Sequence, residues 1–166
     1  MLNKKKVAPL GAMAAVAMAS TGAQAATQTA NAEVKIVAAV QLAQNDILDF
    51  GIIASGGAAA TVIMPTGSNT RTCGTGLTCA GTARRGRFTV SGATTGYVVA
   101  INIPTTTISL SAGGGNAMSV SLVPSTTSFS STGVPVEFFV GGTLSVGANQ
   151  VAGNYTGTYA VTADYQ

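Results

Sequence analysis

The sequence predicts an all-β protein, a sandwich or a barrel, on three observations. Short runs in which apolar and polar residues alternate recur along the chain, and Thr, Val, Ile and Tyr dominate them. These residue types fit a pleated, half-buried surface. Clusters of Gly, Pro, Asn or Ser separate the runs at even spacing, which is typical of many short antiparallel strands. Beyond the first 25 residues no stretch keeps the period of a helix, so the prediction contains no helix.

The first predicted strands are short and rich in Val, Ile and Leu. Residues 34–37 and 40–42 begin the series, and residues 47–53 follow as one apolar run. Residues 60–64 alternate until Pro65, which cannot donate to a strand ladder and therefore ends the run. The later runs have β-branched or aromatic residues at alternate positions, and they lie at 87–90, 97–103, 108–110, 118–122, 134–140, 143–146 and 155–165.

The last run has the clearest alternation. Because side chains in a strand alternate between two faces, its odd positions share one face and its even positions the other. The even positions are Thr, Thr, Ala, Thr and Asp, so we expect them to face solvent. The odd positions, which we expect to face the core, are Tyr155, Gly157, Tyr159, Val161, Ala163 and Tyr165.

The composition excludes most catalysts. Charged residues make up 8% of the chain, and there is no histidine, which is the usual proton shuttle and the commonest metal ligand. The five acidic residues form no pair that spacing would identify as an acid and a base. No glycine-rich segment matches a phosphate-binding loop. We therefore expect neither an enzyme nor a cofactor or metal.

The N-terminus resembles a secretory signal peptide. Three lysines, Lys4 to Lys6, precede an apolar stretch at residues 7–19, and Ala23 and Ala25 form an A-x-A cleavage site. A membrane-spanning helix needs a longer apolar run, so we expect cleavage after Ala25 and no membrane insertion afterwards. The remaining chain has five basic and five acidic residues, and 5 − 5 = 0, so the basic pI of 9.1 belongs mostly to the leader.

Five residues separate the two cysteines. Cys73 and Cys79 enclose Gly-Thr-Gly-Leu-Thr, whose two glycines allow the chain to reverse. In an oxidising compartment this arrangement predicts a structural disulfide. Two sulfurs without histidine do not make a zinc site, and the spacing is not that of a redox C-x-x-C.

The C-terminal region resembles the signature of chaperone–usher pilins. Tyr165 is a penultimate aromatic residue at the end of an alternating strand, and Gly153 is fourteenth from the C-terminus. Residues 140–144 and 152–159, with the segment Leu48-Asp49-Phe50-Gly51, also resemble exported bacterial proteins related to pilins and to spore-coat U-type domains. The resemblance covers most of the chain after the leader.

This resemblance implies an immunoglobulin-like antiparallel β-sandwich that lacks its final strand. A periplasmic chaperone, and then the N-terminal extension of the next copy, would add a strand to the open sheet. The implied function is a non-enzymatic subunit of a bacterial surface fibre, exported to the Gram-negative periplasm and assembled at the cell surface through an outer-membrane usher. The chain segment beside the added strand would carry Gly153, Tyr155, Gly157, Tyr159, Val161, Ala163 and Tyr165.

The donor strand would come from residues 26–36, with residues 37–166 as the sandwich domain. From Ala26 onward small apolar residues alternate with polar ones, which would present one apolar face to a groove. Residues 34–37 could instead belong to the first strand of the domain. The extension could also fold back, which would give a self-complemented secreted or cell-surface binding module. The candidate donor residues are Ala30, Ala32, Val34 and Ile36.

One basic cluster remains. Arg84, Arg85 and Arg87 precede or adjoin Phe88, but three arginines fall short of the basic face that nucleic acid requires. We interpret the cluster as a solvated turn or one that protects a sheet edge, and we expect no nucleic-acid partner.

Overall fold

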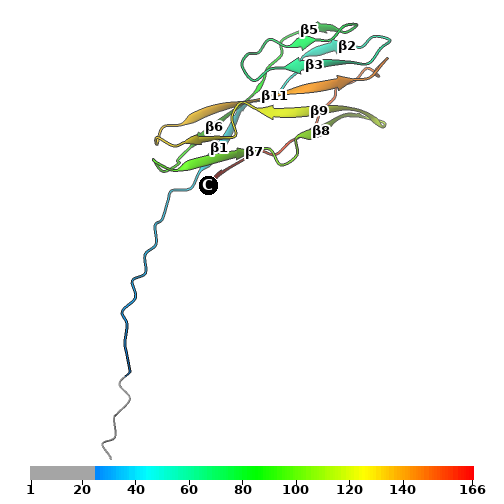
Figure 1. Cartoon of the computed structure of the whole chain (residues 1–166). Helices are drawn as coiled ribbons and strands as arrows, with labels where there is room; N and C mark the ends of the chain where they lie inside the picture. Colours follow the sequence, from blue (N-terminus) through cyan, green and yellow to red (C-terminus); the bar gives the residue numbers. More distant parts are fainter. Residues whose placement is uncertain (1–24) are drawn as a thin grey trace, which may run out of the picture. The chain divides into compact units, whose positions relative to one another are not determined.

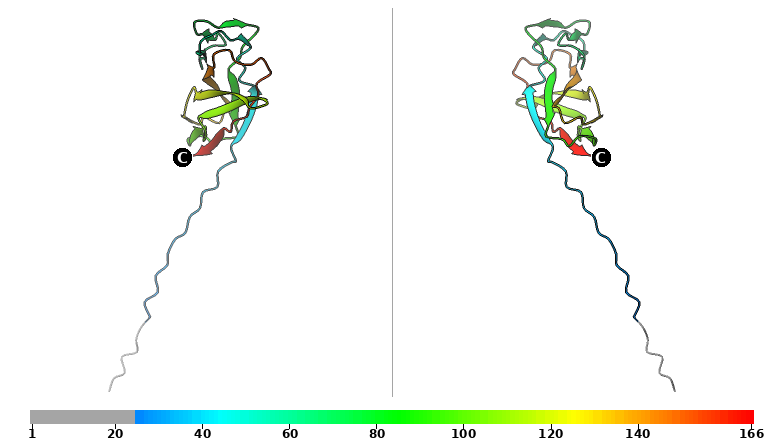
Figure 2. Two further views of the ribbon diagram at one scale, coloured as in Figure 1. Left: turned by 90° about the vertical axis from the view of Figure 1, so that its right-hand side faces the viewer. Right: turned by 90° about the vertical axis from the view of Figure 1, so that its left-hand side faces the viewer.

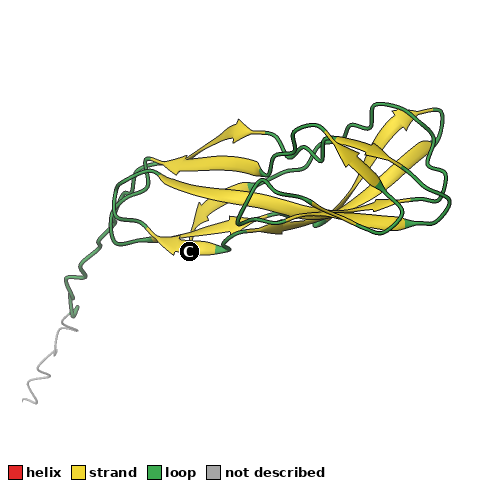
Figure 3. Cartoon of the chain, turned by 90° about the horizontal axis from the view of Figure 1, so that it is seen from above, coloured by secondary structure: helices red, strands yellow, loops and turns green. Residues whose placement is uncertain are grey.

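The computed structural model describes residues 25–166, which contain twelve strands and no helix. All strand pairs are antiparallel, and the arrangement is consistent with a β-sandwich (Figures 1 and 3). The all-β prediction is confirmed. The largest sheet has the order β1-β6-β11-β3-β4, with β9 paired to β11 and β8 to β9. Its strands are β1 (Gln41–Asp46), β3 (Ala60–Met64), β4 (Thr72–Cys73), β6 (Gly86–Ser91), β8 (Thr107–Gly113), β9 (Asn116–Pro124) and β11 (Val136–Val146).

Two smaller sheets complete the fold. One has the order β10-β7-β12, and the other contains only β2 and β5. The Cys73–Cys79 disulfide is confirmed, and it joins β4 of the largest sheet to β5. The bond therefore ties the two-stranded sheet to the main sheet. The strands of the smaller sheets are β7 (Val98–Asn102), β10 (Ser128–Ser130), β12 (Thr162–Tyr165), β2 (Ile52–Ala54) and β5 (Thr78–Ala80).

The longest strand, β11, is the centre of the largest sheet. On one side it pairs first with β6 and then with β3, while β9 covers the opposite side. The sequence predicted two strands, 134–140 and 143–146, separated by Gly141 and Gly142. This prediction was wrong, because β11 is continuous. A Cβ on Gly141 would collide with the carbonyl oxygen of Met64, and one on Gly142 would lie 2.7 Å from that of Ser121. These glycines permit close backbone contact inside a continuous strand, where their sequence pattern indicated a turn.

The run predicted as one strand at residues 47–53 is a strand only from Ile52 onward, because the chain changes partners there. Asp49 forms a single bridge with Arg84, and β2 begins only afterwards and pairs with β5. Between them Gly51 has a φ of 71°, and its amide donates to the Asp49 carboxylate at 2.7 Å. Glycine tolerates this left-handed conformation, so the kink is encoded locally.

The chain divides into two units, Met1–Val34 and Lys35–Gln166. Residues 25–40 have no regular secondary structure, so the strand predicted at 34–37 is wrong. Val34 and Ile36 are 83% and 89% exposed, which leaves nothing for such a strand to pack against. The predicted signal peptide at 1–25, including Ala23, lies outside the described residues except for Ala25.

The predicted C-terminal strand at 155–165 is much shorter in the structure, which assigns only Thr162–Tyr165 to β12. The alternation survives nonetheless. Its odd positions are half-buried and its even positions exposed, with Gly157 as the exposed exception. The segment before β12 is extended but has almost no strand partner, and this is why it is not a ladder strand. In the side views β12 lies beside β1 (Figure 2).

The core lies between the largest sheet and the β10-β7-β12 sheet. Phe88 and Phe138 stack at its centre with ring centroids 5.3 Å apart. Val99 and Ile101 of β7 contribute from the smaller sheet. The other buried apolar side chains are Phe50, Val62, Met64, Ala83, Val90, Ala93, Ile103, Val120, Leu122, Val140, Leu144 and Val146.

Candidate functional site

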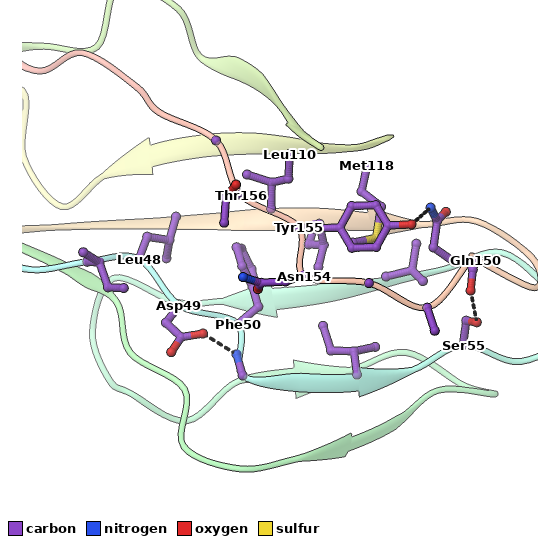
Figure 4. A pocket seen from close by; sticks show the side chains of 18 of the residues that line it. Leu48, Asp49, Phe50, Ser55, Leu110, Met118, Gln150, Asn154, Tyr155 and Thr156 are labelled. Atoms are coloured by element: carbon purple, nitrogen blue, oxygen red, sulfur yellow. Dashed lines mark hydrogen bonds between the residues drawn. The ribbon is translucent and has the colours of Figure 1, made fainter. Parts of the chain in front are cut away.

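A groove with an apolar floor runs between two chain segments that lie far apart in the sequence. Residues 47–55 form one wall and residues 150–159 the other, with a cavity volume of about 970 Å³ between them (Figure 4). The floor consists of inward-facing side chains of β8, β9 and β11. These are Leu110, Met118, Leu144 and Val146.

The first wall is held from its outer side. Asp49 exchanges both backbone hydrogen bonds with Arg84 at 2.8 Å. The Arg71 guanidinium donates to the carbonyls of Phe50 at 2.7 Å and Ala80 at 2.6 Å. These contacts position the wall without using the backbone edge of β2 that faces away from β5. No sequence pattern marks Arg71, because its partners are the backbone carbonyls of residues 9 and 21 positions away.

The second wall is almost unpaired. Among residues 150–161 the structure bridges only Thr156 to another strand, through hydrogen bonds of 2.8 and 3.1 Å with Ser111. Two glycines let this wall pass close to β8. A Cβ on Gly157 would lie 2.6 Å from the Ser109 carbonyl, and one on Gly153 would lie 2.8 Å from the Cβ of Ala112. The wall therefore lies on the edge of β8 while most of its own backbone remains unpaired.

One end of the groove is closed by contacts between the walls. The Ser55 hydroxyl donates to the Gln150 carbonyl at 3.2 Å, and the Asn149 amide donates to the Gly56 carbonyl at 2.8 Å. The Gln150 side chain in turn donates to the hydroxyl of Tyr155 at 2.8 Å (Figure 4). This cluster fixes the separation of the walls at that end.

Tyr159 is the last residue of the second wall, and it lines the groove. Its ring packs edge-on against Phe88, with centroids 6.2 Å apart. Its hydroxyl is buried beside Gly86, where a Cβ would lie 2.7 Å from the oxygen, and it has no hydrogen-bond partner among the described residues. Burial raises the pKa of Tyr159 from 10.0 to about 12, because the phenolate would lose its solvation.

The seven residues predicted to flank an added strand divide into two groups. Four of them line the groove, namely Gly153, Tyr155, Gly157 and Tyr159. Val161, Ala163 and Tyr165 instead pack against the core as the chain enters β12. The alternation of the C-terminal segment predicted that these residues share one face. It gave no indication that residues 47–55 form the opposite wall of the groove.

The candidate donor residues are all exposed and lie outside any strand. They are Ala30, Ala32, Val34 and Ile36. The chain becomes attached to the domain just after them. The Lys35 ammonium lies 4.9 Å from the centroid of the Tyr97 ring, and the Tyr165 hydroxyl donates to the carbonyl of Ala38 at 2.8 Å.

The arginine cluster is part of the sheet, so its interpretation as a solvated or edge-protecting turn is wrong for Arg87. Arg87 lies in β6, between β1 and β11. It pairs with Asp46 at 2.7 Å and with Glu137 at 3.2 Å, and Arg84 reaches Asp46 at 3.7 Å. The Arg85 guanidinium lies over the ring of Phe139, 3.5 Å from the ring centroid. These partners occupy the cluster and give it a structural role.

Residues 25–166 contain no group of three or more His, Cys, Asp or Glu side chains that could hold a metal ion. No helix in this part of the chain is long and apolar enough to cross a membrane.

The fold and the groove define a class of protein: an all-β domain with a groove that has an apolar floor and one largely unpaired wall. Residues 40–165 match the family described as "Domain of unknown function (DUF4402)", and the chain belongs to that family. No curated protein matches the chain. The matched region begins just before β1 and ends within β12, so it includes both walls of the groove.

Proposed function

We propose that this protein is a non-enzymatic structural subunit of a bacterial surface fibre, in which the groove accepts the N-terminal extension of another copy. The observation that carries the proposal is the groove itself. It combines an apolar floor with two walls whose facing backbone edges are largely unpaired. An added strand would bury the floor and pair with the walls, which is how β-strand addition gives affinity.

The chemistry of the extension suits this groove. Its alternating residues from Ala26 onward are small, and the floor is built of larger side chains such as Leu110, Met118 and Leu144. A strand with small inward residues can approach a floor of large ones without overpacking. An immunoglobulin-like domain completed by strand addition is consistent with these features.

The reach of the extension argues against self-complementation. The chain is held at Ala38, and the first residue along the chain that lines the groove is Gln44, six residues further on. To fill the groove of its own domain, the segment 26–37 would have to fold back from Ala38 toward Gln44. About two of its residues would form the turn, and about six would run beside residues 38–44, at about 3.3 Å per residue. About four residues would then enter a groove whose wall extends to Ser55. A second copy has no such restriction.

Head-to-tail strand addition propagates into a filament, because the contact joins two different surfaces. Until a second copy arrives, the open groove is an aggregation hazard that another chain must cover. A periplasmic chaperone would fill this role after export, and an outer-membrane usher would exchange it for the next subunit.

The experiment is an SDS gel of material sheared from the cell surface, run with and without boiling and probed for this protein. We expect a ladder of multimers that collapses to monomer on boiling. Deletion of residues 26–33 should abolish the ladder while leaving a chaperone-bound subunit. As a matched control, the triple variant Thr27→Ser, Thr29→Ser and Asn31→Ser alters only the opposite face of the extension and should keep the ladder. A single monomer band in both lanes of the wild type would refute the proposal.

A further inference from the structure

The outer face of the largest sheet carries two rows of hydroxyl side chains. Strand register places the residues of each row opposite one another across β8, β9, β11, β3 and β4. We call this surface the hydroxyl face. Its first row is Thr107, Ser121, Thr143, Ile63 and Thr72, and its second row is Ser109, Ser119, Ser145 and Thr61.

Eight of these nine residues are Ser or Thr, and none is charged. All are exposed except Thr143, which is half-buried. Protein surfaces ordinarily carry many charges. The charged side chains of this sheet gather elsewhere, where Asp46, Arg84, Arg87 and Glu137 form ion pairs across β1, β6 and the first half of β11.

The hydroxyl face lies on the side of the sheet away from the groove. Side chains alternate along a strand, so Ser109 and Ser119 point outward while Leu110 and Met118 point into the groove. In β11 the same holds for Ser145 beside Leu144. A strand bound in the groove would leave the hydroxyl face open.

A second copy of the same face is a chemically suitable partner. Each hydroxyl both donates and accepts hydrogen bonds, so two identical hydroxyl faces can satisfy one another. Two identical charged faces would instead oppose like charges. The described residues have five basic and five acidic side chains, and 5 − 5 = 0, so net repulsion between copies is absent as well.

The area of the face limits where this contact can be stable. Five strands about 4.8 Å apart and two rows of about 6.7 Å along each give about 300 Å². A stable pair of proteins buries about 800 Å² on each partner. One pair of subunits would therefore associate weakly, whereas a fibre that repeats the face many times would gain by multivalency.

We propose that the hydroxyl face is a lateral contact between neighbouring fibres of this protein, so that single fibres gather into bundles while single subunits do not dimerise. This inference rests on the proposed fibre function. The occupant of the face is a second copy, presented by the adjacent fibre.

The test compares wild-type fibres with the double variant Ser119→Lys and Ser121→Lys. Like charges brought together across an interface oppose association, so we expect the fraction of fibres that pellets at low speed to fall about tenfold. The matched control is Ser128→Lys with Ser130→Lys, two exposed positions on β10 of the other sheet, and it should bundle as the wild type does. Electron microscopy distinguishes bundles from single fibres.

High salt distinguishes charge repulsion between the lysine variants from misfolding of the variant. At about 1 M salt the Debye length falls to about 3 Å, so bundling of the lysine variant should return if charge alone prevents it. Fibres of the wild type that remain single would overturn the inference and leave the fibre function standing. So would bundles that persist in the lysine variant, or bundles that require an added polysaccharide. Failure to form any fibre would instead refute the proposed function.

Discussion

The hydroxyl of Tyr165 accepts a hydrogen bond from the amide of Thr94 at 2.7 Å and donates one to the carbonyl of Ala38 at 2.8 Å. Its ring packs edge-on against Tyr97, with centroids 5.7 Å apart. The penultimate residue thereby ties the last strand to the point where the N-terminal extension joins the domain. This contact fixes the point from which the extension leaves the domain, and so limits how far residues 26–37 can reach.

Replacement of Tyr165 by Phe tests this tie, because it keeps the ring and removes both hydrogen bonds. We expect the free energy of unfolding to fall by about 1–2 kcal/mol. Hydrogen exchange at the Thr94 amide should accelerate, because that amide loses its acceptor. Urea denaturation and NMR exchange measure the two effects. An unchanged exchange rate at Thr94 would show that the tie does not hold in solution.

Removal of the disulfide should loosen the first wall of the groove. The bond joins β5 to β4, and among the strands of residues 25–166 β5 alone pairs with β2. The double variant Cys73→Ser and Cys79→Ser should lose about 2 kcal/mol, the value expected for a short loop. Exchange at the amides of β2 should increase more than exchange in β6. Equal changes in both strands would contradict a local role for the bond.

The glycines of β11 should be intolerant of a side chain. In Gly142→Ala the new Cβ would lie 2.7 Å from the Ser121 carbonyl and 3.1 Å from Val120, so we expect a loss of about 1–3 kcal/mol. Gly67→Ala is the matched control, because its Cβ would meet nothing within 4 Å. Thermal denaturation of both variants measures the difference, and equal melting temperatures would exclude the close contact.

Tyr159 should make the domain sensitive to alkaline pH. Its pKa is raised to about 12 in the folded state, against 10.0 as the ordinary value. Below pH 10 both states keep the proton, so stability does not depend on this group. Between pH 10 and 12 the unfolded state releases a proton that the folded state retains, so stability falls as pH rises. In Tyr159→Phe this fall should be smaller, as urea titrations across that pH range would show. An identical pH profile in the variant would rule out the buried phenol as its cause.

The same substitution removes a buried hydroxyl that has no partner among the described residues. At neutral pH we therefore expect Tyr159→Phe to leave stability unchanged or to raise it by about 1 kcal/mol. Tyr155→Phe is the control. Its hydroxyl accepts from Gln150 and donates to the carbonyl of Val151, so its removal should lower the free energy of unfolding. A large loss in Tyr159→Phe would indicate a partner for this hydroxyl in solution.

The sequence by itself determined the all-β class, the disulfide and the inward face of the C-terminal segment. Each of these depends on local information: alternation with a period of two, the spacing of Cys73 and Cys79, and the order of residues from Tyr155 to Tyr165. Local patterns also gave the correct centres of β3, β6, β8 and β9, because side chains on a pleated strand repeat strictly.

Only the tertiary structure decided which runs pair and which remain unpaired. Gly141 and Gly142 indicated a turn in sequence, yet neighbouring strands hold them inside β11. Residues 155–161 alternate like a ladder strand, yet the described chain supplies almost no partner for them. The walls of the groove meet through contacts such as Ser55 with Gln150, which are 95 residues apart. Hydrogen bonding between strands is a property of two segments at once, so the pattern of either segment alone cannot specify it.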